Sequence, residues 1–184
     1  MTRLFDISFS FIGLLLLSPI LVILLIIGFF DTGSPIFQQE RVGRGKKPFR
    51  LIKFRSMYLN APSVPTHLAS ASSITSFGSF LRKSKLDELP QLWNVFIGDM
   101  SLVGPRPNLF NQEELIVERQ KLGIYDVRPG ITGLAQVNQI DMSTPKLLAE
   151  TDAEMIKNFN SINYLRYIIL TVLGKGKGDR IKKI

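Results

Sequence analysis

The sequence predicts an α+β protein that is mainly helical, with an N-terminal membrane segment, a short β-hairpin and amphipathic helices. An uncharged apolar run opens the chain, and two short extended runs follow it around a glycine-containing loop. Apolar residues recur at helical spacing in much of the remainder. With 184 residues, the chain has room for one domain and a small appendage.

The membrane segment extends from Ile7 to Phe30, where 18 of 24 residues are apolar and none is charged. This run is longer than the roughly 7–15 residues of a signal-peptide core, which disfavours a cleaved leader. Pro19, next to Ser18, should kink or break the helix because it removes a backbone hydrogen bond. Each half is then about 18 Å long, too short to cross a ~30 Å hydrocarbon core but long enough to enter and return. The residues alone leave open a kinked spanning helix and a re-entrant hairpin.

Charge constrains both the orientation and the partners. Between Arg41 and Arg55 there are seven cations and no acidic residue, so this segment should stay on the cytoplasmic side. The formal net charge of +8 indicates an anionic partner: lipid headgroups, nucleic acid or phosphorylated small molecules.

The residue types present exclude several kinds of chemistry. The chain has no cysteine and one histidine, His67, which excludes disulfide scaffolds, thiol nucleophiles, zinc clusters and iron–sulfur sites. His67 falls in a polar loop expected over 60–79, and we interpret it as a bystander. Any reaction must therefore use carboxylates, Lys, Arg, hydroxyls or an oxygen-bound metal.

The remaining elements follow from spacing and turn residues. We expect a hairpin, then a helix that begins at Asp87 and ends before Gly98, then a polar helix, and last one long helix with an apolar stripe from Met155 to Val172. That stripe suits either a helix in the membrane interface or an ordinary core-facing helix. The two strands and the polar helix are expected at Ile36–Val42, Pro48–Phe54 and Glu113–Lys121. Two stiff turns are expected around Gly104–Pro107 and Arg128–Gly133.

The most suggestive chemistry lies at Asp87 and Glu88. Asp87 is a favourable N-cap and Glu88 would be the first helical residue, where free N–H groups favour anions. A carboxylate there can act as nucleophile, general base or metal ligand, although Asp-Glu also opens many ordinary helices. Lys53 and Arg106 are candidate phosphate contacts, or solvated or lipid-facing cations.

Taken together, these strings resemble the small polyprenyl-phosphate phosphoglycosyltransferases, which are monotopic bacterial sugar transferases. The resemblance covers nearly the whole chain in family order. It rests on Ser18-Pro19, Lys53-Phe54-Arg55-Ser56-Met57, Leu81-Arg82-Lys83, Leu86-Asp87-Glu88-Leu89-Pro90-Gln91-Leu92-Trp93-Asn94, Gly98-Asp99-Met100-Ser101-Leu102-Val103-Gly104-Pro105-Arg106-Pro107 and Arg128-Pro129-Gly130-Ile131-Thr132-Gly133-Leu134-Ala135-Gln136-Val137-Asn138.

The resemblance implies a monotopic architecture. Residues 1–32 would form a re-entrant helix-break-helix with its break at Ser18-Pro19, and residues 33–184 a catalytic domain at the membrane interface. The protein would lie on the cytoplasmic face of the bacterial inner membrane, in contact with membrane lipids and downstream glycosyltransferases.

The resemblance also implies a reaction and its residues. Asp87 would attack the β-phosphate of a UDP-sugar, release UMP and hold the sugar phosphate, which polyprenyl (undecaprenyl) phosphate would then accept. Glu88 would be a base or orienting carboxylate, and Mg²⁺, with Asp87 as a ligand, would neutralise the diphosphate. Lys53, Arg82 and Arg106 would contact phosphate. The donor would be a UDP-N-acetylhexosamine or a deoxy derivative, in the first membrane step of glycan synthesis.

The chain departs from the commoner family pattern after Asn138, where Gln139-Ile140-Asp141 replaces a segment containing an arginine. That leaves one phosphate or sugar contact unassigned. The alternative function is a non-enzymatic membrane adaptor that binds anionic lipids. A nucleic-acid binder is disfavoured, because Trp93 falls on a core stripe and no aromatic-basic platform is evident.

Overall fold

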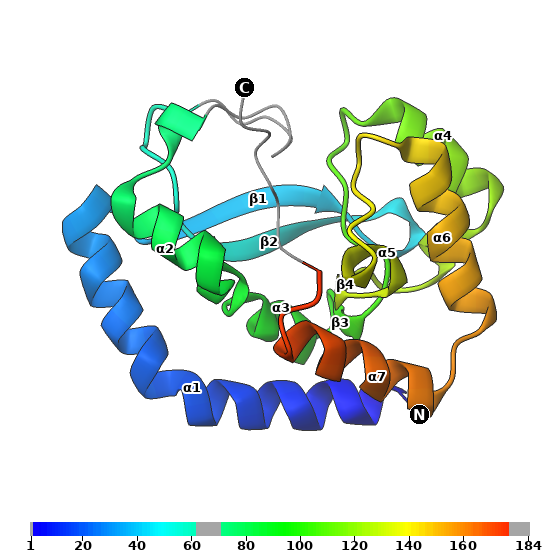
Figure 1. Ribbon diagram of the computed structural model, residues 1–184, viewed down its shortest axis with the longest axis horizontal. Coiled ribbons are helices and arrows are strands. Elements are labelled where there is room, and N and C mark those ends of the chain that lie inside the picture. Colours follow the sequence, from blue (N-terminus) through cyan, green and yellow to red (C-terminus); the bar gives the residue numbers. More distant parts are fainter. Residues whose placement is uncertain (1, 62–70, 177–184) are drawn as a thin grey trace.

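A computed structural model describes residues 2–61 and 71–176, and the order of its elements matches the mainly helical α+β expectation. In Figure 1, α1 runs along the bottom of the view and then up its left side, the β1–β2 hairpin crosses the centre, and α4 and α6 lie at the right. The elements are α1 (Thr2–Thr32), β1 (Ile36–Val42), η1 (Arg44–Lys46), β2 (Pro48–Phe54), η3 (Ala71–Ser73), α2 (Ser76–Ser84), η4 (Leu86–Glu88), α3 (Gln91–Ile97), β3 (Ser101–Val103), α4 (Glu113–Lys121), η5 (Ile124–Asp126), β4 (Gly130–Thr132), α5 (Leu134–Val137), α6 (Pro145–Lys157) and α7 (Ser161–Val172).

The apolar helix α1 is bent near its middle and is not interrupted there (Figure 1). Pro19 has no N–H, so the carbonyl of Leu15 loses its helical donor. The Ser18 hydroxyl replaces that donor with a hydrogen bond of 2.8 Å to the same carbonyl. The kink predicted from Ser18-Pro19 is present, but the helix continues through it, because a side chain satisfies the group that the proline leaves free.

The first turns of α1 are attached to the rest of the protein through Asp6. Its side chain is 2 % exposed. The Oδ1 atom accepts hydrogen bonds from the hydroxyl of Ser101 at 2.9 Å, the N–H of Leu102 at 2.9 Å and the hydroxyl of Tyr164 at 2.8 Å. A carboxylate buried with three donors holds α1 against β3 and α7.

Two further contacts attach the ends of α1 to the same body. Arg3 donates to the backbone carbonyls of Val95 and Phe96, at the end of α3. At the other end of α1, the Thr75 hydroxyl donates to Asp31 at 2.7 Å, and Thr75 is also the N-cap of α2. Both ends of the apolar helix therefore contact one compact unit.

The predicted hairpin is confirmed at both strand boundaries. Strands β1 and β2 pair antiparallel, from Ile36 opposite Phe54 to Val42 opposite Pro48. Helix α3 covers the free edge of β2 through the buried side chain of Asn94, which accepts from Ile52 N–H at 3.0 Å and donates to the Arg50 carbonyl at 2.8 Å.

A second, parallel pair of strands was not expected from the sequence. Strands β3 and β4 have three residues each, too few for an alternating pattern to be visible. Gly130 makes the pairing possible, since a Cβ there would lie 2.0 Å from the Gly104 nitrogen. The main core packs on this pair and is formed by Leu51, Val95, Met100, Leu102, Val103, Val137, Met155, Tyr164 and Tyr167.

The predicted long C-terminal helix is wrong, because it is two helices, α6 and α7. The chain leaves the helical path at residues 158–160 and Asn160 caps α7, accepting from Asn163 N–H at 2.8 Å. The expected loop over 60–79 is also shorter at its end, since α2 begins at Ser76. His67 and the basic residues after Gly176 lie outside the described residues.

Helices α2, α3 and α7 expose large apolar side chains, as α1 does. On α7, Tyr164 and Tyr167 pack inward, while Ile162 and Val172 are 79 % and 81 % exposed. Helix α7 therefore has a core face and an outer apolar face, and the part of the predicted stripe on α7 lies on the outer face. The core-facing alternative is wrong for these residues, and a place in the membrane interface stays a prediction. The outer faces of these helices carry Phe80, Trp93, Ile97, Ile162, Leu165, Ile169 and Val172.

Replacing Asp6 by Ala should destabilise the protein by about 3 kcal/mol, because it leaves buried donors without an acceptor. For a chain of this size that corresponds to a Tm lower by roughly 6–12 °C, measurable by thermal unfolding in detergent. Asp31→Asn, at the exposed end of the same helix, keeps an acceptor for Thr75 and should leave Tm nearly unchanged. Equal losses in the two variants would contradict the role of Asp6.

Candidate active site

The Asp-Glu pair lies in the 3₁₀ turn η4, before α3. The predicted N-cap role of Asp87 is therefore wrong: α3 begins at Gln91, and no side chain caps it. Pro90 explains the difference, because it has no N–H to donate to the Leu86 carbonyl, which accepts from Leu89 N–H at 3.2 Å instead. The short helix offers little attraction for anions, so that attraction must come from side chains.

Glu88 is the centre of an ion cluster. Its Oε1 atom lies 3.3 Å from Lys53 Nζ and 2.9 Å from Arg106 Nη2. The side chains of Glu88 and Lys53 are 14 % exposed and that of Arg106 is 22 % exposed, so their interaction is less screened than a surface pair. The structure thus brings together three of the predicted site residues, from η4, β2 and the loop after β3, beside Asp87.

Arg82 lies on the last turn of α2 and uses its Nε–H to bind the Ser56 hydroxyl at 2.8 Å. Its Nη1 atom is buried and has no hydrogen-bond partner among the described residues. A buried guanidinium donor without a partner is costly and suits a site that an anion enters. Arg82 does not join the ion cluster on Glu88, but its partner Ser56 lies two residues after the end of β2, the strand that carries Lys53.

Lys85 was missed as a site residue. It adopts the left-handed conformation, with φ 59°, directly before η4, which is uncommon for a residue with a side chain. Burial lowers the pKa of its ammonium group; Glu88 opposes that change and Arg106 adds to it. These influences place Lys85 within the electrostatic field of the cluster. Sequence analysis did not single out Lys85, because the Asp-Glu pair after it was interpreted as the start of a helix.

The loop that carries Arg106 is held from behind by a buried ion pair that sequence analysis did not detect. Arg119 on α4 lies 2.7 Å from Asp152 on α6, with exposed fractions of 2 % and 0 %. Arg119 also donates to the backbone carbonyl of Arg106 at 2.8 Å and to Asn108 at 2.9 Å. The guanidinium therefore fixes the backbone from which Arg106 reaches Glu88.

The donor set suits a divalent cation only jointly with a phosphate ligand. Within the described part of the chain, no group of three or more His, Cys, Asp or Glu side chains is close enough to hold a metal. Mg²⁺ commonly uses one or two carboxylates together with substrate phosphates. Asp87 is a carboxylate of the kind this pattern uses, and it lies next to Glu88, whose Oε1 accepts from Lys53 and Arg106.

Replacing Arg119 by Met should cost about 3–5 kcal/mol, because Asp152 stays buried without its partner. The double variant Arg119→Met/Asp152→Leu should lose less than the sum of the two single variants, measured by chemical denaturation in detergent micelles. Lys121→Gln, which breaks an exposed pair with Glu118, should cost under about 1 kcal/mol. Additive losses for Arg119 and Asp152 would contradict the pairing.

Comparison with known proteins agrees with the family resemblance that the sequence motifs indicate. The chain is 38 % identical over 171 residues to "Uncharacterized sugar transferase EpsL" of Bacillus subtilis (strain 168), a match covering 92 % of the chain and 84 % of that protein. It is 39 % identical over 181 residues to "UDP-glucose:undecaprenyl-phosphate glucose-1-phosphate transferase" of Klebsiella pneumoniae, covering 92 % of the chain. It is 36 % identical over 190 residues to "UDP-galactose-lipid carrier transferase" of Erwinia amylovora, also covering 92 % of the chain.

The lengths of these relatives differ. The chain spans 39 % of both the Klebsiella and the Erwinia protein. The model of the family described as "Bacterial sugar transferase" matches residues 1–176. That match covers almost the whole chain and confirms the family that the motifs resemble. The chain belongs to the bacterial sugar transferase family.

Proposed function

We propose that this protein transfers a phospho-sugar from a UDP-sugar to polyprenyl phosphate and releases UMP. The observation that carries the proposal is the cluster in which Lys53 and Arg106 converge on Glu88 next to Asp87. Names of relatives support the substrate classes, since the Klebsiella protein is named for UDP-glucose and undecaprenyl phosphate. The proposed pathway step is the first membrane step of a bacterial glycan.

The reaction would take place in two displacements at one phosphorus. An Asp87 carboxylate oxygen attacks the β-phosphorus, the bond from that phosphorus to the bridging oxygen breaks, and UMP leaves with the electron pair. A phosphate oxygen of polyprenyl phosphate then attacks the same phosphorus, and the bond to Asp87 breaks. The carboxylate is regenerated, and neither step requires both large substrates at once.

The other residues manage charge around Asp87. Glu88 orients Lys53 and Arg106, whose positive charges would attract the phosphate oxygens of the donor. Arg82 contributes its buried Nη1 donor, which has no hydrogen-bond partner in the described part of the chain. Asp87 would also be the carboxylate that Mg²⁺ shares with the diphosphate, and that cation, when bound, supplies further neutralisation of phosphate charge.

The fold supports a monotopic membrane contact. Helix α1 has a mean hydropathy of 2.9 over its most apolar 18 residues, and 11 % of that window is buried. Because Arg3, Asp6 and Asp31 attach both ends to one compact unit, a helix entering and leaving the same leaflet fits better than a spanning helix. We place the protein on the cytoplasmic face of the bacterial inner membrane, given the cations of residues 41–55.

The covalent step predicts an adduct on Asp87. Wild-type protein incubated with a UDP-sugar alone should release UMP and gain the mass of one sugar phosphate, located on residue 87 by peptide mass spectrometry. Asp87→Asn should lower UMP release by on the order of 10³-fold or more, because the amide is a poor nucleophile. A panel of UDP-N-acetylhexosamines and deoxy derivatives would identify the donor.

The matched control is Glu118→Gln, an acidic-to-amide change on the exposed face of α4. It should retain full UMP release and normal membrane association. Turnover by wild-type protein without any adduct on Asp87 would rule out the two-step mechanism. Unchanged pathway activity in Asp87→Ala cells would favour the membrane adaptor instead.

The proposed topology predicts that the two flanks of α1 lie on one side of the membrane. The chain has no cysteine, so single cysteines at Thr2 and Gly45 can be labelled selectively in sealed vesicles. Both should react with a membrane-impermeant maleimide from the same side. Labelling from opposite sides would show that α1 spans the bilayer.

A further inference from the structure

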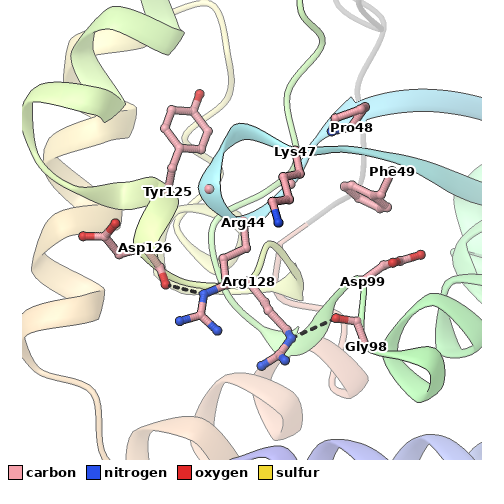
Figure 2. Close-up of a pocket in the computed structure, with 11 residues that line it drawn as sticks. Arg44, Lys47, Pro48, Phe49, Gly98, Asp99, Tyr125, Asp126 and Arg128 are labelled. Atoms are coloured by element: carbon pink, nitrogen blue, oxygen red, sulfur yellow. Dashed lines mark hydrogen bonds between the residues drawn. The ribbon is translucent and has the colours of Figure 1, made fainter.

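A second basic cavity lies at the tip of the hairpin (Figure 2). Its volume is about 700 Å³, it is open to solvent, and it is lined by η1 and the start of β2, the end of α3, and the segment around η5. Arg44, Lys47 and Arg128 are the cations that line it, together with the aromatic side chains of Phe49 and Tyr125. None of these residues belongs to the cluster around Glu88.

The cavity is too far from Glu88 to share one phosphate with it. Pro48, at the start of β2, lines the cavity, whereas Lys53 near the end of β2 pairs with Glu88. They are five positions apart on an extended strand, which is about 17 Å at roughly 3.4 Å per residue. Helix α3 indicates a similar separation, because Glu88 in η4 lies before its first turn and Gly98, which lines the cavity, lies after its last turn.

The two arginines of the cavity are oriented in the same manner. Arg44 donates through Nε to the Asp126 carbonyl at 2.8 Å, and Arg128 donates through Nε to the Gly98 carbonyl at 2.8 Å. In Figure 2 these two bonds run in opposite directions, and among the described residues neither guanidinium forms a hydrogen bond through its Nη atoms. Each guanidinium is held in place by one edge and offers the other, the geometry that binds phosphate oxygens in pairs.

The acidic residues nearby do not neutralise these cations. In Figure 2 the Asp126 carboxylate points away from Arg44, and the Asp99 carboxylate points away from Arg128. Asp99 instead accepts from Asn94 Nδ2 at 3.3 Å. Among residues 2–61 and 71–176, no ion pair involves Arg44, Lys47 or Arg128. Three like charges around one cavity repel one another unless an anion binds between them.

We propose that this cavity is a second anion site, which binds a phosphate group through Arg44, Lys47 and Arg128 independently of the cluster at Glu88. The phosphate belongs either to a soluble ligand or to a phospholipid headgroup, which present the same chemistry to the three cations. The site goes beyond the proposed transferase reaction, because it lies outside the residues assigned to adduct formation on Asp87.

The test measures inorganic phosphate binding to the full chain in nonionic detergent, by isothermal titration calorimetry at constant ionic strength. Lys47→Gln and Arg44→Lys should each weaken phosphate binding at the cavity at least tenfold. The first removes a charge, and the second removes the paired Nη donors of the guanidinium group. The matched control is Lys46→Gln, which removes the same charge one residue away, from a lysine that binds Gln120 at 2.9 Å. It should change the Kd less than twofold.

A second arm places the same variants in phosphatidylcholine nanodiscs with and without phosphatidic acid and measures Tm. Binding to the folded state raises Tm, so a rise that depends on Lys47 and occurs only with phosphatidic acid assigns the phosphate to a lipid. A response to inorganic phosphate assigns it to a soluble ligand.

Three results would overturn the proposal: equal weakening by Lys46→Gln and Lys47→Gln, no response in either arm, or binding that is lost only with Lys53→Gln. Equal weakening would show that phosphate binding depends only on the general surface charge. Loss only with Lys53→Gln would assign all binding to the cluster at Glu88. Asp87→Asn should leave phosphate binding at the cavity unchanged. A failed adduct experiment and a failed binding experiment are therefore distinguishable.

Discussion

The candidate site depends on the side chain of Asn94, which is fully buried between α3 and β2. Its amide takes the place of a neighbouring strand, with one hydrogen bond to Arg50 and one from Ile52. Each bond contributes only about 1 kcal/mol of net stability, but together they allow one register between helix and strand. Because η4 leads into α3 and Lys53 follows Ile52, that register brings Lys53 to Glu88.

The same arrangement determines where the site lies relative to the proposed membrane surface. The turn η4 joins α2 to α3, and both helices expose large apolar side chains, Phe80 on α2 and Trp93 on α3, at 53 % and 48 %. In the proposed membrane-bound state these two faces would contact lipid, and the turn between them would lie at the depth of the headgroups. There a lipid-linked phosphate could approach Asp87 without leaving the membrane, while a water-soluble donor could enter from the other side.

Local signals predicted much of the fold, and long-range contacts account for what they missed. The hairpin and α4 were predicted at their observed boundaries because the residues that signal where these elements begin and end lie next to them in the sequence. The single C-terminal helix was wrong because its apolar stripe continues across the break before Asn160. At the site, Lys53, Glu88 and Arg106 were named individually, but their convergence on one oxygen depends on α3 packing against β2. Arg119 and Asp152, 33 residues apart, leave no local pattern.

Four arginines of this protein differ in which nitrogen atoms of the guanidinium group form hydrogen bonds to the protein. Both Nη atoms of Arg119 donate to protein groups, on Arg106, Asn108 and Asp152. They are therefore not available to a ligand, and Arg119 stabilises the fold. Arg82, Arg44 and Arg128 do the opposite: in the described structure each is held through Nε alone. A guanidinium fixed by Nε has lost most of its rotational freedom and still presents its fork, so an anion binds it at a lower entropic cost. The proposed anion-binding roles of Arg82 and of Arg44 and Arg128 at the hairpin tip rest on this shared geometry.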